Sequence, residues 1–163
     1  QYFEDKFDLH AYLVMQFSQK WNQTWHTLLQ RHQGDFFAAV PPLFKEILDM
    51  MTDKKNYAFW KNTFFQLRNS KEMRKTLHQQ RCSKHNDDRE LIDQHKLRIE
   101  LTKRNYLLLK RQITTMMIQS ISMYFMAEHL KVDDPYHEAI QGFNTLLNWL
   151  QYGIQAEGGN QDA

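Results

Sequence analysis

The chain has 163 residues, of which 42% are hydrophobic and 25% charged, a composition typical of one folded domain. It contains only 5 glycines and 3 prolines, and this scarcity of turn-forming residues argues against a β-sandwich or a β-barrel. The single cysteine, Cys82, excludes an intrachain disulfide framework, and the formal net charge is only +2. We therefore expect an all-α fold, a bundle of four to five helices without a sheet.

Apolar side chains at steps of three and four residues predict a first helix over residues 3–28. Gly34 is its expected stop, because a residue without Cβ adopts the left-handed cap conformation at no steric cost. A second helix is expected to begin at Pro41 and Pro42, since proline is tolerated in the first helical turn and not in the interior. This helix should end near Asp53.

The longest apolar stripe predicts that one helix dominates the bundle. A third helix is expected from Asn56, whereas residues 70–81 offer enough apolar side chains only for an exposed or mobile helix. Residues 88–130 then contain neither glycine nor proline, which predicts a continuous helix of about 40 residues, roughly 65 Å long. The other helices are expected to pack around it.

The last helix is expected to begin at Pro135, with Asp134 as its N-cap, and to end at Gly153. We expect residues 1–153 to form one domain and residues 154–163 to be a disordered tail, because residues 155–163 carry no aromatic or branched side chain. Four residues on the stripes of the two most apolar helices should be buried together: Ile113, Ile121, Phe143 and Leu147.

The sequence has no glycine-rich phosphate loop and none of the common hydrolase or calcium-binding motifs. The acidic pairs Asp87–Asp88 and Asp133–Asp134 precede helices and are expected to cap them. We therefore predict no catalytic residue, no metal site and no cofactor. A weaker alternative is a metal-binding or enzymatic bundle, because His10 and His95 lie on buried stripes and could meet in one layer.

Basic residues concentrate in the middle of the chain. Residues 68–111 hold 13 Lys or Arg against 6 acidic residues, whereas residues 112–163 hold only Lys131 against 6 acidic residues. Such a segment is typical of a solvated helix face or a surface for an acidic protein, and the alternative is a nucleic-acid-binding helical domain that contacts phosphates. The predicted basic ridge, within residues 96–111, consists of Lys96, Lys103, Arg104, Lys110 and Arg111.

A flank of the last helix is predicted to bind a partner. Leu146, Trp149 and Tyr152 lie beside its main stripe, and large aromatic side chains dominate protein interfaces. Another protein or a second copy of this chain is the expected partner, unless the first helix or the loop after Leu130 covers the aromatic pair. The methionines between residues 107 and 126 either fill the core or line an adaptable groove.

These patterns predict a non-catalytic protein-interaction or scaffolding module. The uncharged run of residues 112–127 covers 16 residues and is too short to span a bilayer, so no membrane association is expected. The unpaired Cys82 favours an intracellular location. The chain does not begin with methionine, and we therefore expect a domain cut from a larger protein.

Overall fold

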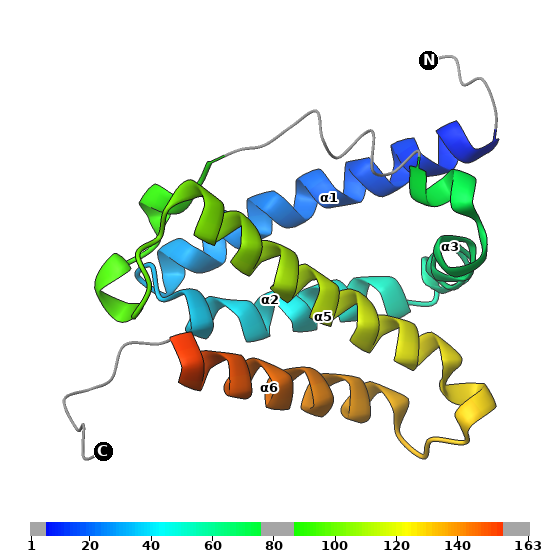
Figure 1. Cartoon of the computed structure of the whole chain (residues 1–163). Coiled ribbons are helices and arrows are strands. Elements are labelled where there is room, and N and C mark those ends of the chain that lie inside the picture. Colours follow the sequence, from blue (N-terminus) through cyan, green and yellow to red (C-terminus); the bar gives the residue numbers. More distant parts are fainter. Residues whose placement is uncertain (1–5, 76–86, 155–163) are drawn as a thin grey trace.

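The computed structural model describes residues 6–75 and 87–154 (Figure 1). These residues contain no β-strand, so the all-α prediction is confirmed. No helix among them is both long enough and apolar enough to cross a bilayer. A short helical stretch covers residues 71–75. The other elements are α1 (Lys6–Arg31), α2 (Phe36–Thr52), α3 (Tyr57–Asn69), the 3₁₀ turns η1 (Arg89–Leu91) and η2 (Gln94–Lys96), α5 (Lys103–Leu130) and α6 (Pro135–Ile154).

The bundle consists of two helical hairpins, α1–α2 and α5–α6, which meet where α2 packs on α6. Figure 1 shows α1 and α2 side by side, and α5 and α6 side by side. α2 also contacts α3 and α6, and Phe44 of α2 stacks on Phe143 of α6 with ring centroids 4.1 Å apart. The predicted core is confirmed, because Ile113, Ile121, Phe143 and Leu147 are all buried in one cluster.

The turn between α1 and α2 explains the glycine at position 34. The Gly34 N–H donates to the Leu29 carbonyl over 2.8 Å, which closes the helix as in a Schellman motif. Both Gln33 (φ 55°) and Gly34 (φ 80°) are left-handed, so the first left-handed residue is Gln33 and not Gly34. A Cβ at Gly34 would lie 2.7 Å from Asp93 N and 2.8 Å from Leu91 O. Glycine is therefore required because residues 91–93 pack directly on this turn.

The second helix begins five residues earlier than predicted. Asp35 is its N-cap, and the Asp35 carboxylate accepts a hydrogen bond from Ala38 N (3.2 Å). Pro41 and Pro42 therefore lie inside α2 rather than at its start. The prediction rests on the prolines alone and does not consider Asp35. This residue supplies the acceptor that the backbone N–H groups at a helix N-terminus need.

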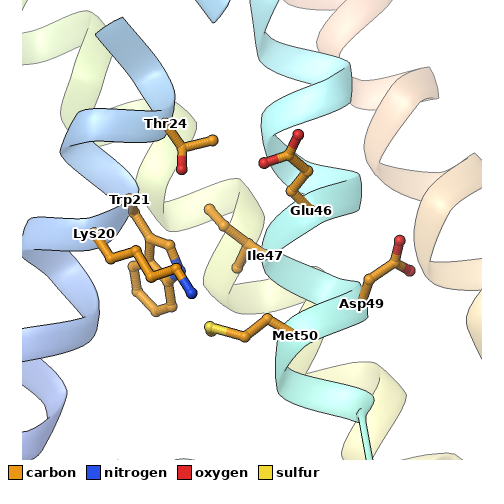
Figure 2. A pocket seen from close by; sticks show the side chains of 7 residues that line it. All are labelled: Lys20, Trp21, Thr24, Glu46, Ile47, Asp49 and Met50. Atoms are coloured by element: carbon orange, nitrogen blue, oxygen red, sulfur yellow. The ribbon is translucent and has the colours of Figure 1, made fainter. Parts of the chain in front are cut away.

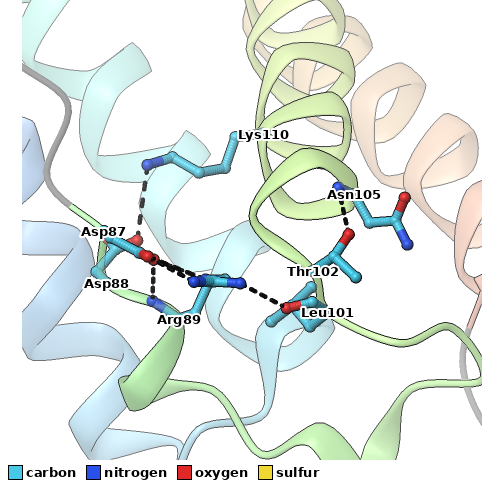
Figure 3. Close-up of polar contacts among 7 residues, drawn as sticks. All are labelled: Asp87, Asp88, Arg89, Leu101, Thr102, Asn105 and Lys110. Atoms are coloured by element: carbon cyan, nitrogen blue, oxygen red, sulfur yellow. Dashed lines mark hydrogen bonds and ion pairs between the residues drawn. The ribbon is translucent and has the colours of Figure 1, made fainter.

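The predicted 40-residue helix is wrong, because α5 covers only the 28 residues Lys103–Leu130. Thr102 is its N-cap, and the Thr102 hydroxyl accepts from Asn105 N over 3.1 Å (Figure 3). The Gln94 side chain holds the preceding backbone in an irregular course, since it donates to Ile99 O (2.7 Å) and accepts from Leu101 N (2.8 Å). The Asp93 carboxylate also accepts from His95 N over 3.0 Å at the start of η2. Capping side chains at Asp93 and Thr102 thus interrupt a stripe that has helical spacing.

The start of α6 agrees with the prediction, because the Asp134 carboxylate accepts from His137 N (3.1 Å) and Pro135 is the first helical residue. Gly153 lies inside α6, which extends to Ile154. The predicted tail, residues 155–163, is outside the described residues, and so is the segment 76–86 with Cys82. The single-domain boundary therefore stays a prediction.

Candidate functional site

Large apolar side chains are exposed on the outer side of α6. Trp149 is 68% exposed and Tyr152 79% exposed, while Leu146 is half-buried. The alternative, in which α1 or the loop after Leu130 covers the two aromatic rings, is therefore wrong. Both rings are therefore available for a partner, although partner binding itself stays a prediction.

A groove of about 490 Å³ lies beside these side chains, between α5 and α6. Gly142 borders it, and a Cβ at Gly142 would meet no atom of the described residues within 4 Å, so the backbone is accessible there. Each of the two alternatives for the methionines holds for part of α5. Met116 and Met117 are buried in the core, whereas Met123 is 51% exposed and lines the groove. We call this surface the α5–α6 face and define it by Met123, Gly142, Leu146, Trp149 and Tyr152.

The two ends of the α5–α6 hairpin carry opposite charges. Lys103, Arg104 and Arg111 are exposed in the N-terminal half of α5. At the other end, where α5 leads into α6, the exposed residues include Asp133, Asp134 and Glu138. The hairpin is therefore basic at one end and acidic at the other, although the chain as a whole is nearly neutral.

The predicted basic ridge is not continuous. Lys96 belongs to η2 and not to α5, and its ammonium lies 3.6 Å from the Asp35 carboxylate. Lys110 Nζ turns to Asp88 (3.6 Å) and lies over the Tyr106 ring, 4.9 Å from its centroid. Lys96, Lys103 and Lys110 do not line one helix face at steps of seven residues, because α5 begins only at Lys103. Three members remain exposed on α5: Lys103, Arg104 and Arg111.

Asp88 ties α1 to α5, and neither Asp87 nor Asp88 caps α5 (Figure 3). Asp88 is 8% exposed, and its Oδ2 lies 3.0 Å from His26 Nε2 of α1 while its Oδ1 faces Lys110 of α5. Asp87 forms an ion pair with Arg89 (2.7 Å), and hydrogen bonds from Arg89 hold the pKa of Asp87 below its ordinary value. Asp88 therefore anchors the irregular segment to α1 and α5, whereas the ion pair of Asp87 lies within that segment.

The two histidines proposed for a buried pair do not meet. His10 Nε2 of α1 forms a hydrogen bond with Thr63 Oγ1 of α3, and the His10 ring stacks on Phe59 with centroids 4.9 Å apart. His95 is exposed in η2, beside the opposite end of α1. Within residues 6–75 and 87–154 no group of three or more His, Cys, Asp or Glu side chains could hold a metal ion. The histidine-pair interpretation is thus wrong.

Burial of His10 predicts a pH-dependent stability. Desolvation lowers the pKa of His10 below its ordinary value of 6.5, so the unfolded chain binds the proton more readily than the folded chain. The free energy of unfolding should therefore decrease as the pH falls through about 6.5, until the folded-state pKa is passed. Urea denaturation between about pH 7.5 and pH 5.5 measures this decrease. His10→Gln should make it smaller and His95→Gln should not; equal pH dependence in both variants would contradict the assignment.

Comparison with known families decides the class of this protein. Residues 35–154, which are 120 of the 163 residues, match the family described as tetracyclin repressor-like, C-terminal domain. The chain belongs to this family. The matched residues contain all the described helices from α2 to α6, and α1 lies before the matched range. No curated protein and no solved structure matches the chain.

Membership of this family corrects the predicted function. Tetracyclin repressor-like C-terminal domains are parts of transcriptional regulators, so the prediction of a generic scaffolding module is wrong. Nucleic-acid binding, the alternative, is closer to this class of protein, but the C-terminal domain that the chain matches is not a nucleic-acid-binding domain of the predicted kind. Transcriptional regulators are in general not enzymes.

Proposed function

We propose that this chain is the self-associating and ligand-responsive part of a transcriptional regulator, and that a second copy covers its α5–α6 face. The observation that carries the proposal is the exposure of Trp149 and Tyr152 beside the groove between α5 and α6. C-terminal domains of this family mediate dimerisation, which supports a second copy of the chain as the partner.

The composition of the α5–α6 face suits a symmetric interface. Exposed aromatic and methionine side chains are enriched in interfaces, and a few of them supply most of the binding free energy. Gly142 allows the backbone of a facing helix to come close, because no side chain stands there. In a two-fold dimer each copy contributes the same patch, so Trp149 of each copy can contact the α5–α6 face of the other.

The charges favour one relative orientation of the two copies. If the hairpins run in opposite directions, the basic end with Arg104 and Arg111 faces the acidic end with Asp133 and Glu138 of the second copy. Parallel hairpins would instead bring like charges together, which is unfavourable at short range. We therefore infer an antiparallel arrangement, whose association should weaken as the salt concentration rises.

A pair of matched substitutions tests the proposal. Met123 lies in the groove and is 51% exposed, whereas Phe65 lies on α3 and is 62% exposed. Met123→Glu should shift the chain towards monomer in sedimentation velocity experiments, because it places a charge in an apolar interface. Phe65→Glu should leave the mass unchanged. The proposal fails if both variants sediment like the unmodified chain, or if Phe65→Glu alone dissociates it.

A further inference from the structure

A hollow of about 230 Å³ lies between α1 and α2, apart from the α5–α6 face (Figure 2). Trp21, Ile47 and Met50 form its apolar wall, and Lys20, Thr24 and Glu46 place polar groups around it. Ligand pockets for drug-sized molecules usually measure about 300–1,000 Å³. This hollow is smaller and therefore suits a ligand with a single ring.

The α1 side of the hollow presents hydrogen-bond donors. Trp21 Nε1 is buried and has no acceptor among the described residues, although a buried N–H without a partner is costly. The Lys20 ammonium is exposed next to it and forms no ion pair within the described part of the chain (Figure 2). The indole is held in place by Trp60 and Phe17, with centroids 5.6 and 6.5 Å from that of Trp21. The Trp21 N–H and the Lys20 ammonium are thus two donors without an acceptor among the described residues, and a ligand can supply one.

The α2 side presents one available acceptor. The Glu46 carboxylate is exposed and has no ion-pair partner among the residues that the structure describes. Asp49 also lines the hollow (Figure 2), but its carboxylate is already occupied, because Lys45 Nζ binds it at 2.6 Å and the Tyr136 hydroxyl donates to it. On the α2 side, the Glu46 carboxylate can therefore receive a donor from a bound molecule.

We propose that this hollow binds a single-ring aromatic carboxylate that carries a hydroxyl or amino group on the far side of the ring. The carboxylate accepts from Trp21 Nε1 and pairs with the Lys20 ammonium, and the hydroxyl or amino group donates to Glu46. The ring lies against Trp21, Ile47 and Met50, which supply the apolar contacts. This inference rests on one part of the proposed function, the response of the chain to a small molecule. It does not depend on the α5–α6 face.

Calorimetric titration of the full chain with 4-hydroxybenzoate, 3-hydroxybenzoate and 4-aminobenzoate tests the assignment. At least one of the three should bind, and the fluorescence of the chain should change because Trp21 lines the hollow. Lys20→Gln should weaken binding about tenfold or more, since it removes a charge-assisted hydrogen bond. Lys103→Gln, a matched change of an exposed lysine on α5, should leave the affinity unchanged. Trp21→Phe, which keeps a ring and removes the N–H, should also weaken binding.

The proposal is overturned if none of the three acids binds at millimolar concentration, or if Lys20→Gln and Lys103→Gln bind equally well. Sedimentation of the same samples separates this outcome from the proposed self-association. A chain that forms dimers and ignores the acids refutes only the hollow as a binding site. A monomeric chain that binds them refutes only the second copy.

Discussion

Replacing Phe143 with alanine is expected to lower the free energy of unfolding by about 3–5 kcal/mol. The Phe143 side chain is completely buried and stacks on Phe44 at the contact between α6 and α2. Removing the ring leaves a cavity at the place where the two helical hairpins meet. Urea denaturation at a fixed protein concentration measures the change.

Phe65 provides the matched control, since it is also a phenylalanine but is 62% exposed on α3. Phe65→Ala should change the free energy of unfolding by no more than about 0.5 kcal/mol, as is usual for surface positions. If Phe143→Ala unfolded no more readily than Phe65→Ala, the packing of α6 on α2 would be refuted.

Replacing Trp149 with alanine is expected to weaken self-association by more than about 2 kcal/mol, which corresponds to roughly a thirtyfold increase of the dissociation constant. Trp149 borders the groove, and its ring is 68% exposed in the single chain. Its removal therefore costs contacts with the second copy and few contacts within the bundle. Sedimentation equilibrium over a range of concentrations measures the dissociation constant.

The same substitution should lower the stability of the monomer less than Phe143→Ala does. This comparison must be made at protein concentrations well below the dissociation constant, because dimerisation itself stabilises the folded chain by mass action. A Trp149→Ala chain that unfolds as readily as Phe143→Ala would show that Trp149 supports the bundle and not the interface.

Much of the fold could be predicted from the sequence because apolar periodicity reports burial directly. The stripe through Phe143 and Leu147 placed α6 and its core face correctly, and the cap at Asp134 placed its start. Periodicity failed for residues 88–102, where Ile92, Leu97 and Leu101 are buried from an irregular backbone. Burial alone does not require a helix, and the hydrogen bonds of capping side chains decided the local structure there.

The functional site was predictable only in part. The exposed flank with Trp149 and Tyr152 follows from helical spacing, because the core stripe of α6 occupies another side of the helix. The partners of Asp88 do not follow from spacing, since His26 and Lys110 come from helices that only the fold brings together. The hollow beside Trp21 likewise depends on how α1 packs on α2. The family match extends over residues 35–154.

The mass of the unmodified chain in solution tests the central claim most directly. Sedimentation equilibrium over a wide range of concentrations should give a mass that approaches twice the 19.8 kDa of the single chain and decreases on dilution. High salt should shift this equilibrium towards the monomer, because opposite charges face each other in the proposed antiparallel arrangement. A mass of 19.8 kDa at every concentration would contradict the account of the α5–α6 face as a surface for a second copy.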